Sequence, residues 1–458
     1  MIPDSTNNGG NGGDSSSNNL TNFQSVNGLE NIFPPTINLD KIEFNSPENE
    51  QTLVEVGKLP FIWFNDIQIN SIESFYLRTT TFLPTLSITF LDSYGFFDNL
   101  RFANDDDRVK IFIDSKDPLL KPIYIEFKIL KFRKVDEKLF SLEGIMNINR
   151  MLMTKLESFG NSTSFEVMKK VATLSNLGFT TNVNNTNDIM TWINPGSRVF
   201  EFCKDVIRRS YRSDSSFMFG FVDVYYNLNF IDVESQIKFD LSKQTGILSG
   251  DLNEVKRKLS LEDQTDDLFI YLSNDGSSQG TSNYIEFYKV FNNSTTNSIK
   301  NGYVSKLKYY NWVDKSFLEF DIEAITNDDN LILKSDDEDF LSENISYKWG
   351  GKIIKDNAHE NYHYSQIQNE LNLNELQKIG LEVILPLPNY NLHRFMKIYV
   401  MLINQGMREI NPPYNAKLSG EWLVTDIQYF ISNSVLKQKV RLMRRDLGFS
   451  QEEEESGN

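Results

Sequence analysis

Cysteine, histidine and basic residues are scarce in this 458-residue sequence. The single cysteine, Cys203, cannot form an intramolecular disulfide, and its place on an apolar helical face indicates a buried thiol. Lysine and arginine number 46 against 63 acidic residues, a net charge of −17. This balance argues against a protein that binds nucleic acid through phosphate contacts.

Long apolar runs are missing as well. No stretch approaches the roughly 18 apolar residues of a membrane-spanning helix. The N-terminal sequence MIPDSTNNGG has neither the basic region nor the apolar segment of a secretory signal. We therefore expect no membrane-spanning segment and no secretory signal.

Catalytic motifs are nearly absent. The sequence has no G-x-S-x-G elbow, no phosphate-binding glycine loop and no paired-cysteine zinc site, so we expect no cofactor. One stretch, HENYH, matches the H-E-x-x-H pattern through His359, Glu360 and His363. A zinc peptidase needs this motif on a rigid, half-buried helix with a third ligand downstream. The polar flanks KDNA and YSQIQ favour an exposed loop or helix start, so these three residues are the metal candidates but no metal is predicted.

Aromatic residues and alternating apolar segments are abundant, with 34 Phe and 19 Tyr. About six alternating segments follow one another from FIWFNDIQI to LFSLEGIMNI without helices between them, which favours an antiparallel barrel or sandwich. The last hundred residues return to the same pattern. We predict a mixed β fold with an α+β insertion, in which two antiparallel β-barrels accompany a helix-helix-hairpin domain.

The composition changes along the chain and divides it into domains. We predict a disordered Asn/Gly/Ser-rich arm (1–35), a first β-barrel (36–160), a helix-helix-hairpin domain (161–240), a β-rich region with an insertion (241–365), the closing strands of a second barrel (366–447) and an acidic tail (448–458).

The clearest secondary-structure signals lie in the central stretch, from Thr163 to Glu234. Thr163 and Glu166 form a capping box for a first helix that Gly178 ends. Asn194 and Ser197 offer start signals for a second helix, whose apolar residues repeat at three- and four-residue spacing from Val199. From Phe217 the pattern alternates, so two strands are expected around a polar, aromatic turn.

The residues of this central stretch resemble the baseplate hub proteins of tailed bacteriophages, a family related to the hub part of type VI secretion spikes. Two further segments are similar to that family, LPTLSITFLDSYGFFDN in the first β region and GEWLVTDIQYF near the end. The residues that carry the central resemblance are Asp188, Trp192, Phe200, Phe202, Asp223, Tyr225, Tyr226, Asn227, Leu228, Asp232 and Glu234. Most of residues 273–370 has no counterpart in this resemblance.

The resemblance implies a structural function in the virion. It implies two tail-tube-like barrels per chain, a homotrimer, and an adaptor between a sixfold tail tube protein and a threefold central spike protein. Baseplate wedge proteins are further expected partners. Viral DNA would pass through the lumen without specific binding, assembly would take place in the host cytoplasm, and no enzymatic activity is expected.

Two other function classes stay open from the sequence. A tail hydrolase, either zinc-dependent through HENYH or cell-wall-degrading, would lose activity on Glu360→Gln. A carbohydrate-binding adhesion module would use exposed aromatic residues such as the five tryptophans as a platform. The adhesion module would not require the central helix and hairpin signature.

Overall fold

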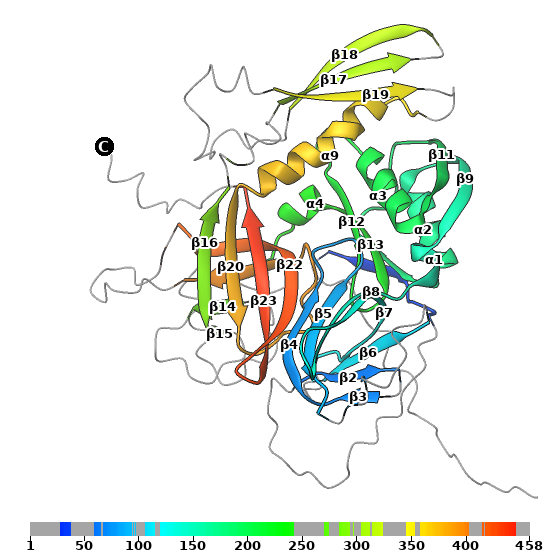
Figure 1. Cartoon of the computed structure of the whole chain (residues 1–458). Coiled ribbons are helices and arrows are strands. Elements are labelled where there is room, and N and C mark those ends of the chain that lie inside the picture. Colours follow the sequence, from blue (N-terminus) through cyan, green and yellow to red (C-terminus); the bar gives the residue numbers. More distant parts are fainter. Residues whose placement is uncertain are drawn as a thin grey trace, which may run out of the picture.

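The protein is mostly β, as a computed structural model shows (Figure 1). The structure describes residues 28–37, 59–97, 106–114, 120–241, 270–273, 284–293, 296, 304–311, 314–323, 345–352, 358–402 and 415–445, except positions 66, 94, 96 and 416. None of the helices in these ranges is long and apolar enough to cross a membrane. The predictions for residues 1–27 and for the acidic tail lie outside the described residues.

Seven strands form what we call the first β unit. They are β2 (Phe61–Phe64), β3 (Ile67–Ile69), β4 (Ile72–Arg78), β5 (Thr85–Leu91), β6 (Arg108–Ile113), β7 (Ile123–Lys134) and β8 (Leu139–Met146). Their order in the sheet is β3-β2-β6-β7-β8-β5-β4. Strands β5, β6 and β8 alternate regularly between buried and partly exposed residues, which is the pattern of strands with one face on a core.

Seven later strands form the second β unit. They are β14 (Ile270–Ser273), β15 (Tyr284–Ile285), β16 (Phe287–Asn292), β20 (Ile379–Leu385), β21 (Lys397–Met401), β22 (Gly420–Ser432) and β23 (Val435–Arg444). Their order is β15-β14-β21-β22-β23-β20-β16. If the strands of each unit are numbered from one to seven in chain order, both units have the sheet order 2-1-5-6-7-4-3. Each strand of the first unit therefore has a counterpart at the same place in the second.

The two β units are joined into one branched sheet. Residues 428–430 of β22 pair antiparallel with residues 76–78 of β4, so the fourteen strands are continuous. Among the described strands of the two units, which form this branched sheet, no closed barrel is found. Contrary to the prediction, the pairing is not antiparallel throughout, because β14 runs parallel to both β15 and β21.

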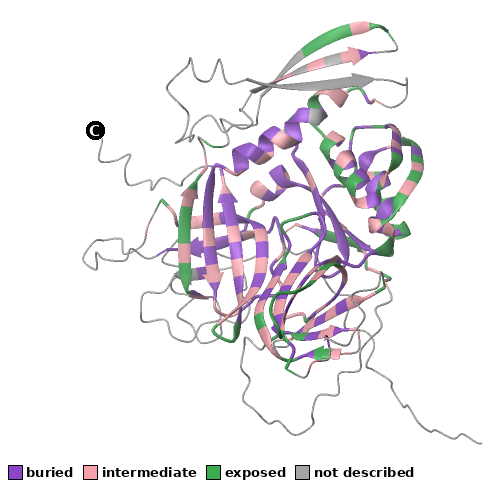
Figure 2. Cartoon of the chain, in the orientation of Figure 1, coloured by how far each residue is buried: buried purple, intermediate pink, exposed green. Residues whose placement is uncertain are grey.

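Between the two β units lies the central unit. It contains α1 (Asn149–Leu152), β9 (Thr154–Ser162), α2 (Ser164–Leu174), β10 (Gly178–Thr181), β11 (Met190–Arg198), α3 (Val199–Arg209), β12 (Met218–Val222), β13 (Asn227–Asp232) and α4 (Val233–Ile237). Strands β10, β13 and β12 form a sheet, and β9 pairs with β11 in a separate ribbon. Figure 2 shows that β12 and β13 are almost wholly buried.

The predicted capping box is present. Thr163 accepts a hydrogen bond from the Glu166 main chain, and the Glu166 side chain accepts one from Thr163. The start signals for α3 were wrong, because Arg198 is its N-cap and makes no side-chain cap bond. Asn194 instead closes a turn, accepting hydrogen bonds from Ser197 N at 2.9 Å and Ser197 Oγ at 2.8 Å.

The end of the predicted arm is structured. Residues Glu30–Phe33 form β1, which pairs with β10 and adds a strand to the edge of the central sheet. Phe33 stacks on Phe179 with ring centroids 6.1 Å apart. The apolar residues at this end of the Asn-rich segment therefore anchor it to the central unit.

An additional element follows β16. Strands β17 (Val304–Asn311), β18 (Ser316–Glu323) and β19 (Ile345–Lys352) form a three-stranded sheet. Helix α9 (Tyr362–Leu376) lies between this sheet and the rest of the molecule (Figure 1). Because β16 precedes and β20 follows it, the sheet and α9 are an insertion within the second β unit, which begins well before residue 366.

Candidate functional site

The polar turn between β12 and β13 is organised by one buried carboxylate. Asp223 Oδ1 accepts hydrogen bonds from the main-chain N–H groups of Tyr225 and Asn227, each at 2.9 Å. Its Oδ2 accepts from the side-chain amides of Asn227 and Asn229, each at 3.1 Å. These four donors compensate the carboxylate for burial, so the turn has a fixed shape.

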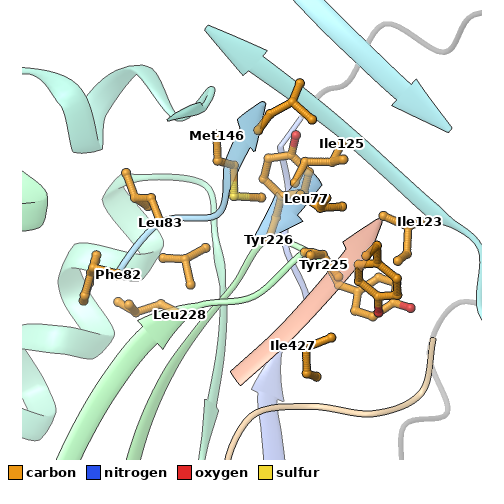
Figure 3. Packing of buried hydrophobic residues seen from close by; sticks show 14 of the residues in the cluster. Leu77, Phe82, Leu83, Ile123, Ile125, Met146, Tyr225, Tyr226, Leu228 and Ile427 are labelled. Atoms are coloured by element: carbon orange, nitrogen blue, oxygen red, sulfur yellow. The ribbon is translucent and has the colours of Figure 1, made fainter. Parts of the chain in front are cut away.

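That shape directs two tyrosines into both β units (Figure 3). Tyr226 has a positive φ of 63°, and its hydroxyl accepts a hydrogen bond from Glu126 N in β7 at 2.9 Å. The Tyr225 hydroxyl donates to the carbonyl of Tyr390, between β20 and β21, at 2.7 Å. Burial raises the pKa of both hydroxyls, so both tyrosines stay protonated. One turn thus contacts the first and the second β unit together.

A second carboxylate fixes the helices of the central unit. Asp188 is fully buried and accepts hydrogen bonds from Ser164 N at 2.8 Å and from Tyr211 N at 2.9 Å. Ser164 begins α2, and Tyr211 follows the end of α3. Burial raises the pKa of Asp188, and these hydrogen bonds oppose that rise. Asp188 therefore joins two helices that are separate in sequence.

A third carboxylate closes the central unit at α4. Asp232 caps this helix through Glu234 N, and the same Oδ1 accepts from Phe217 N at 2.9 Å. Its Oδ2 lies 2.9 Å from Arg212 Nη1. Glu234 is buried and forms an ion pair with Arg445 at 2.7 Å, just after β23. Asp232 is thus a structural hydrogen-bond acceptor, and Glu234 forms an ion pair with a residue of the second β unit.

The apolar signature residues pack in the core. Trp192 is fully buried, and its indole N–H donates to Ser162 O at 2.8 Å. Phe202 stacks on Phe159 with centroids 5.8 Å apart, and Leu228 is completely buried. Phe200 is half-buried, with Lys204 over its ring. The structure therefore brings Asp223, Tyr225, Tyr226, Asn227 and Leu228 together in one turn, while the others stabilise the elements around it.

A cavity of about 170 Å³ lies beside this turn. Asp223, Tyr225, Lys121 and His393 contribute to its wall, and residues 29–35 border it from the N-terminal strand. The Lys121 ammonium lies 4.3 Å from the centre of the Tyr225 ring. Burial lowers the pKa of Lys121 and of His393, while Asp223 opposes both changes.

The HENYH stretch does not lie on one helix. His359 and Glu360 precede α9, and His363 is its second residue. His359 is buried, contrary to the exposed loop expected, and its Nε2 lies 3.1 Å from Arg209 O. Its ring also packs beside Trp192 and Tyr211. Among the residues that the structure describes, no group of three or more His, Cys, Asp or Glu could hold a metal.

Sequence reasoning missed several buried polar residues that join the units. Arg394 Nε donates to Thr425 O at 2.6 Å, and its Nη1 donates to Thr79 O at 2.8 Å, which links β22 to the residue after β4. On α9, Gln368 and Asn369 donate to main-chain carbonyls around the end of α3 and the start of β12. The amide-rich sequence SQIQNELNLN has helical character, but nothing in it marks these amides as buried.

Comparison with known proteins gives structural likeness without detectable sequence relatives. No protein-family profile matches the chain, and no curated protein matches it. The solved structures that it resembles are phage tail, baseplate and type VI secretion proteins.

Three of these structures illustrate the likeness. The tail protein from Neisseria meningitidis MC58 is 10% identical over 85% of this chain and 97% of its own, with a TM-score of 0.49. The 43 kDa tail protein of prophage MuSo2 from Shewanella oneidensis is 10% identical over 84% and 98%, also at 0.49. The c3393 protein of E. coli, a type VI secretion component, is 9% identical over 85% and 77%, at 0.38.

Proposed function

We propose that this protein is the structural baseplate hub of a phage tail, a homotrimer that connects a sixfold tail tube to a threefold central spike. The observation that carries the proposal is the repeated strand order of the two β units. A threefold object can contact a sixfold one evenly only if each subunit offers two similar surfaces. Three chains with two matching β units each supply six such surfaces.

The join between the units supports the same function. Antiparallel pairing of β22 with β4 places the two β units edge to edge within one sheet. The turn of Asp223 contacts both units through Tyr225 and Tyr226. Arg394 adds a third link, across the join itself. These contacts hold the two units in one relative position, as an adaptor between two other assemblies requires.

The acidic signature residues support a structural and non-enzymatic function. The carboxylate oxygens of Asp188, Asp223 and Asp232 accept hydrogen bonds from main-chain or side-chain donors, and these bonds hold helices and strands in place. A net charge of −17 suits a lumen through which DNA passes without binding, because like charges repel. The protein would assemble in the host cytoplasm and remain in the virion, with tube, spike and wedge proteins as partners.

The experiment that tests this function is light scattering on the purified protein, with negative-stain images. A trimer has three times the 53.0 kDa chain mass, about 159 kDa, and should appear as a ring with a central opening. Addition of the tube protein and the spike protein of the same phage should then give complexes on opposite faces. A protein that stays monomeric alone and with both partners would overturn the proposal.

A further inference from the structure

The longest hairpins of the two β units carry the same irregularity. In β7, a bulge between Ile129 and Lys131 faces Gly144 and Glu143 of β8. In β22, a bulge between Val424 and Asp426 faces Leu442 and Arg441 of β23. When the two bulges are aligned, Ile129 corresponds to Val424 and Lys128 corresponds to Leu423. The correspondence of the two β units thus extends to single residues.

The two hairpins differ in which strands pair with β22 and with β7 on the side away from the hairpin partner, here called the outer edge. The outer edge of β22 pairs with β21 as far as Leu423, and beyond the bulge its residues 428–430 pair with β4. The outer edge of β7 pairs with β6 as far as Lys128. Beyond that point, no strand in the described ranges continues along it. The places equivalent to 428–430 are residues 133–135.

The strand that corresponds to β4 lies at the opposite end of the sheet. In the first unit, Leu77 of β4 pairs with Leu86, which pairs with Gly144. In the second unit, Val290 of β16 pairs with Leu381, which pairs with Leu442. Gly144 and Leu442 lie at equivalent places beside the two bulges. Val290 therefore occupies the place of Leu77. Leu77 is fully buried beside β22, whereas Val290 is 40% exposed and Phe287 is 56% exposed. A long edge strand with exposed apolar side chains is a template for another strand.

We propose that β16 of one copy pairs antiparallel with residues 133–135 of β7 in the next copy, repeating between chains the contact that β4 and β22 make within one chain. The register follows from the equivalence, with Phe291 opposite Arg133, Val290 opposite Lys134 and Lys289 opposite Val135. This interface rests on the proposed trimer and deepens it. The contact is head-to-tail, so it closes into a ring when three copies complete the circle.

The main chain of β16 points the right way for this pairing. Asn293 N donates to Lys378 O, which directs residue 293 toward β20. Because main-chain groups alternate along a strand, Val290 directs its N–H and carbonyl away from β20. Leu77 shows the same arrangement, since Thr79, two residues on, donates to Ile427 O of β22 at 3.0 Å.

Charge disfavours one of the two neighbouring registers. In the proposed alignment, no two like charges lie directly opposite each other. A slip by one residue in one direction would place Lys134 opposite Lys289, and like charges directly opposite destabilise a strand pair. A slip in the other direction would place Lys289 opposite Asp136, so charge does not exclude it, but a slip in either direction would turn every side chain of β16 to the other face.

A cysteine cross-link tests the register. The alternation makes Lys289 and Val135 a pair without mutual hydrogen bonds, in which the Cβ atoms lie at the short end of about 4.5–5.5 Å, next to the roughly 3.5–4.5 Å that a disulfide spans. Mild oxidation of the Val135→Cys, Lys289→Cys double variant should give a three-chain band on a non-reducing gel. Val135→Cys with Val290→Cys is the matched control, because residue 290 points to the opposite face. The native Cys203 is fully buried and should not contribute.

A second variant tests the pairing itself. Val290→Pro removes an outward N–H but leaves the hydrogen bonds to β20, because proline is tolerated on an edge strand. We expect a folded chain with native circular dichroism that no longer forms the three-chain species. A trimeric wild-type protein without the cross-link, or with equal cross-linking of the control, would overturn the interface while the hub function stands. A wild-type protein that stays monomeric alone and with its partners would contradict both the interface and the hub function.

Discussion

The hydroxyl of Tyr226 accepts a hydrogen bond from the main-chain N–H of Glu126, 100 residues earlier in the chain, at 2.9 Å. Both residues are buried, and Tyr226 reaches this position from a left-handed backbone conformation. The bond connects the central unit to β7, the strand that also carries the proposed interface. The geometry of the Asp223 turn is thereby coupled to the placement of the first β unit.

Tyr226→Phe should lower the free energy of unfolding by about 1–3 kcal/mol, because it leaves the buried N–H of Glu126 without an acceptor. Chemical denaturation of the two proteins measures this difference. Tyr364→Phe is the matched control, since Tyr364 is 39% exposed and should change stability by less than about 0.5 kcal/mol. Equal effects of the two substitutions would contradict the assigned role of Tyr226.

Asp188→Asn should also destabilise the protein, by about 1.5–3 kcal/mol. Asp188 Oδ1 accepts from Ser164 N and Oδ2 from Tyr211 N, so an amide would place an NH₂ group against one of these donors. Thermal unfolding measures the loss. Asp205→Asn weakens the ion pairs that the half-exposed Asp205 makes with Arg208 and Arg209 on the same helix, and should cost under about 1 kcal/mol. A neutral Asp188→Asn variant would show that the carboxylate is not needed.

Local signals predicted the local structure well. The capping box of Thr163 and Glu166 needs residues three apart, so it was legible in the sequence, and α2 begins where it indicates. The turn at Asp223 was found in the same way. In the central stretch the structure has the helices α2 and α3 and the antiparallel strand pair β12–β13.

Structural features that depend on residues far apart in the sequence could not be predicted from it. Strand β11 was not predicted, because it forms only by pairing with β9, whose partner residues lie 28 to 44 positions earlier in the chain. Nothing in the sequence indicated that the amides of helix α9 are buried against main-chain carbonyls of the central unit. The shared place of β4 and β16 in the two β units requires the sheet order, which no spacing in the sequence reveals.

Gly220→Ala should cost about 1–3 kcal/mol through overpacking. A Cβ atom at Gly220 would lie 2.6 Å from Ile207 Cδ1 of α3 and 3.0 Å from Asn229 O of β13. Chemical denaturation gives the change in the free energy of unfolding. Gly160→Ala in β9 is the matched control, because no heavy atom lies within 4 Å of its Cβ position. If both variants were equally stable, α3 would not be packed closely on β12.

His359 should make the protein less stable in acid. Burial lowers the pKa of His359 from 6.5 to about 4, and the Arg209 guanidinium and His363 add to the effect. Because the folded-state pKa is below the unfolded value, its contribution is complete above pH 6.5 and is lost as the pH falls toward 4. The gap corresponds to about 3 kcal/mol.

His359→Gln separates this effect from the other titrating groups. Glutamine keeps an N–H donor for Arg209 O but takes up no proton. Urea denaturation between pH 4 and 7, at one protein concentration, should give a shallower pH dependence for His359→Gln than for the wild type. His363→Gln should change the slope less, since His363 is less buried. Parallel curves for all three proteins would mean that His359 is protonated as easily in the folded chain as in the unfolded one, which its place between Trp192 and Tyr211 argues against.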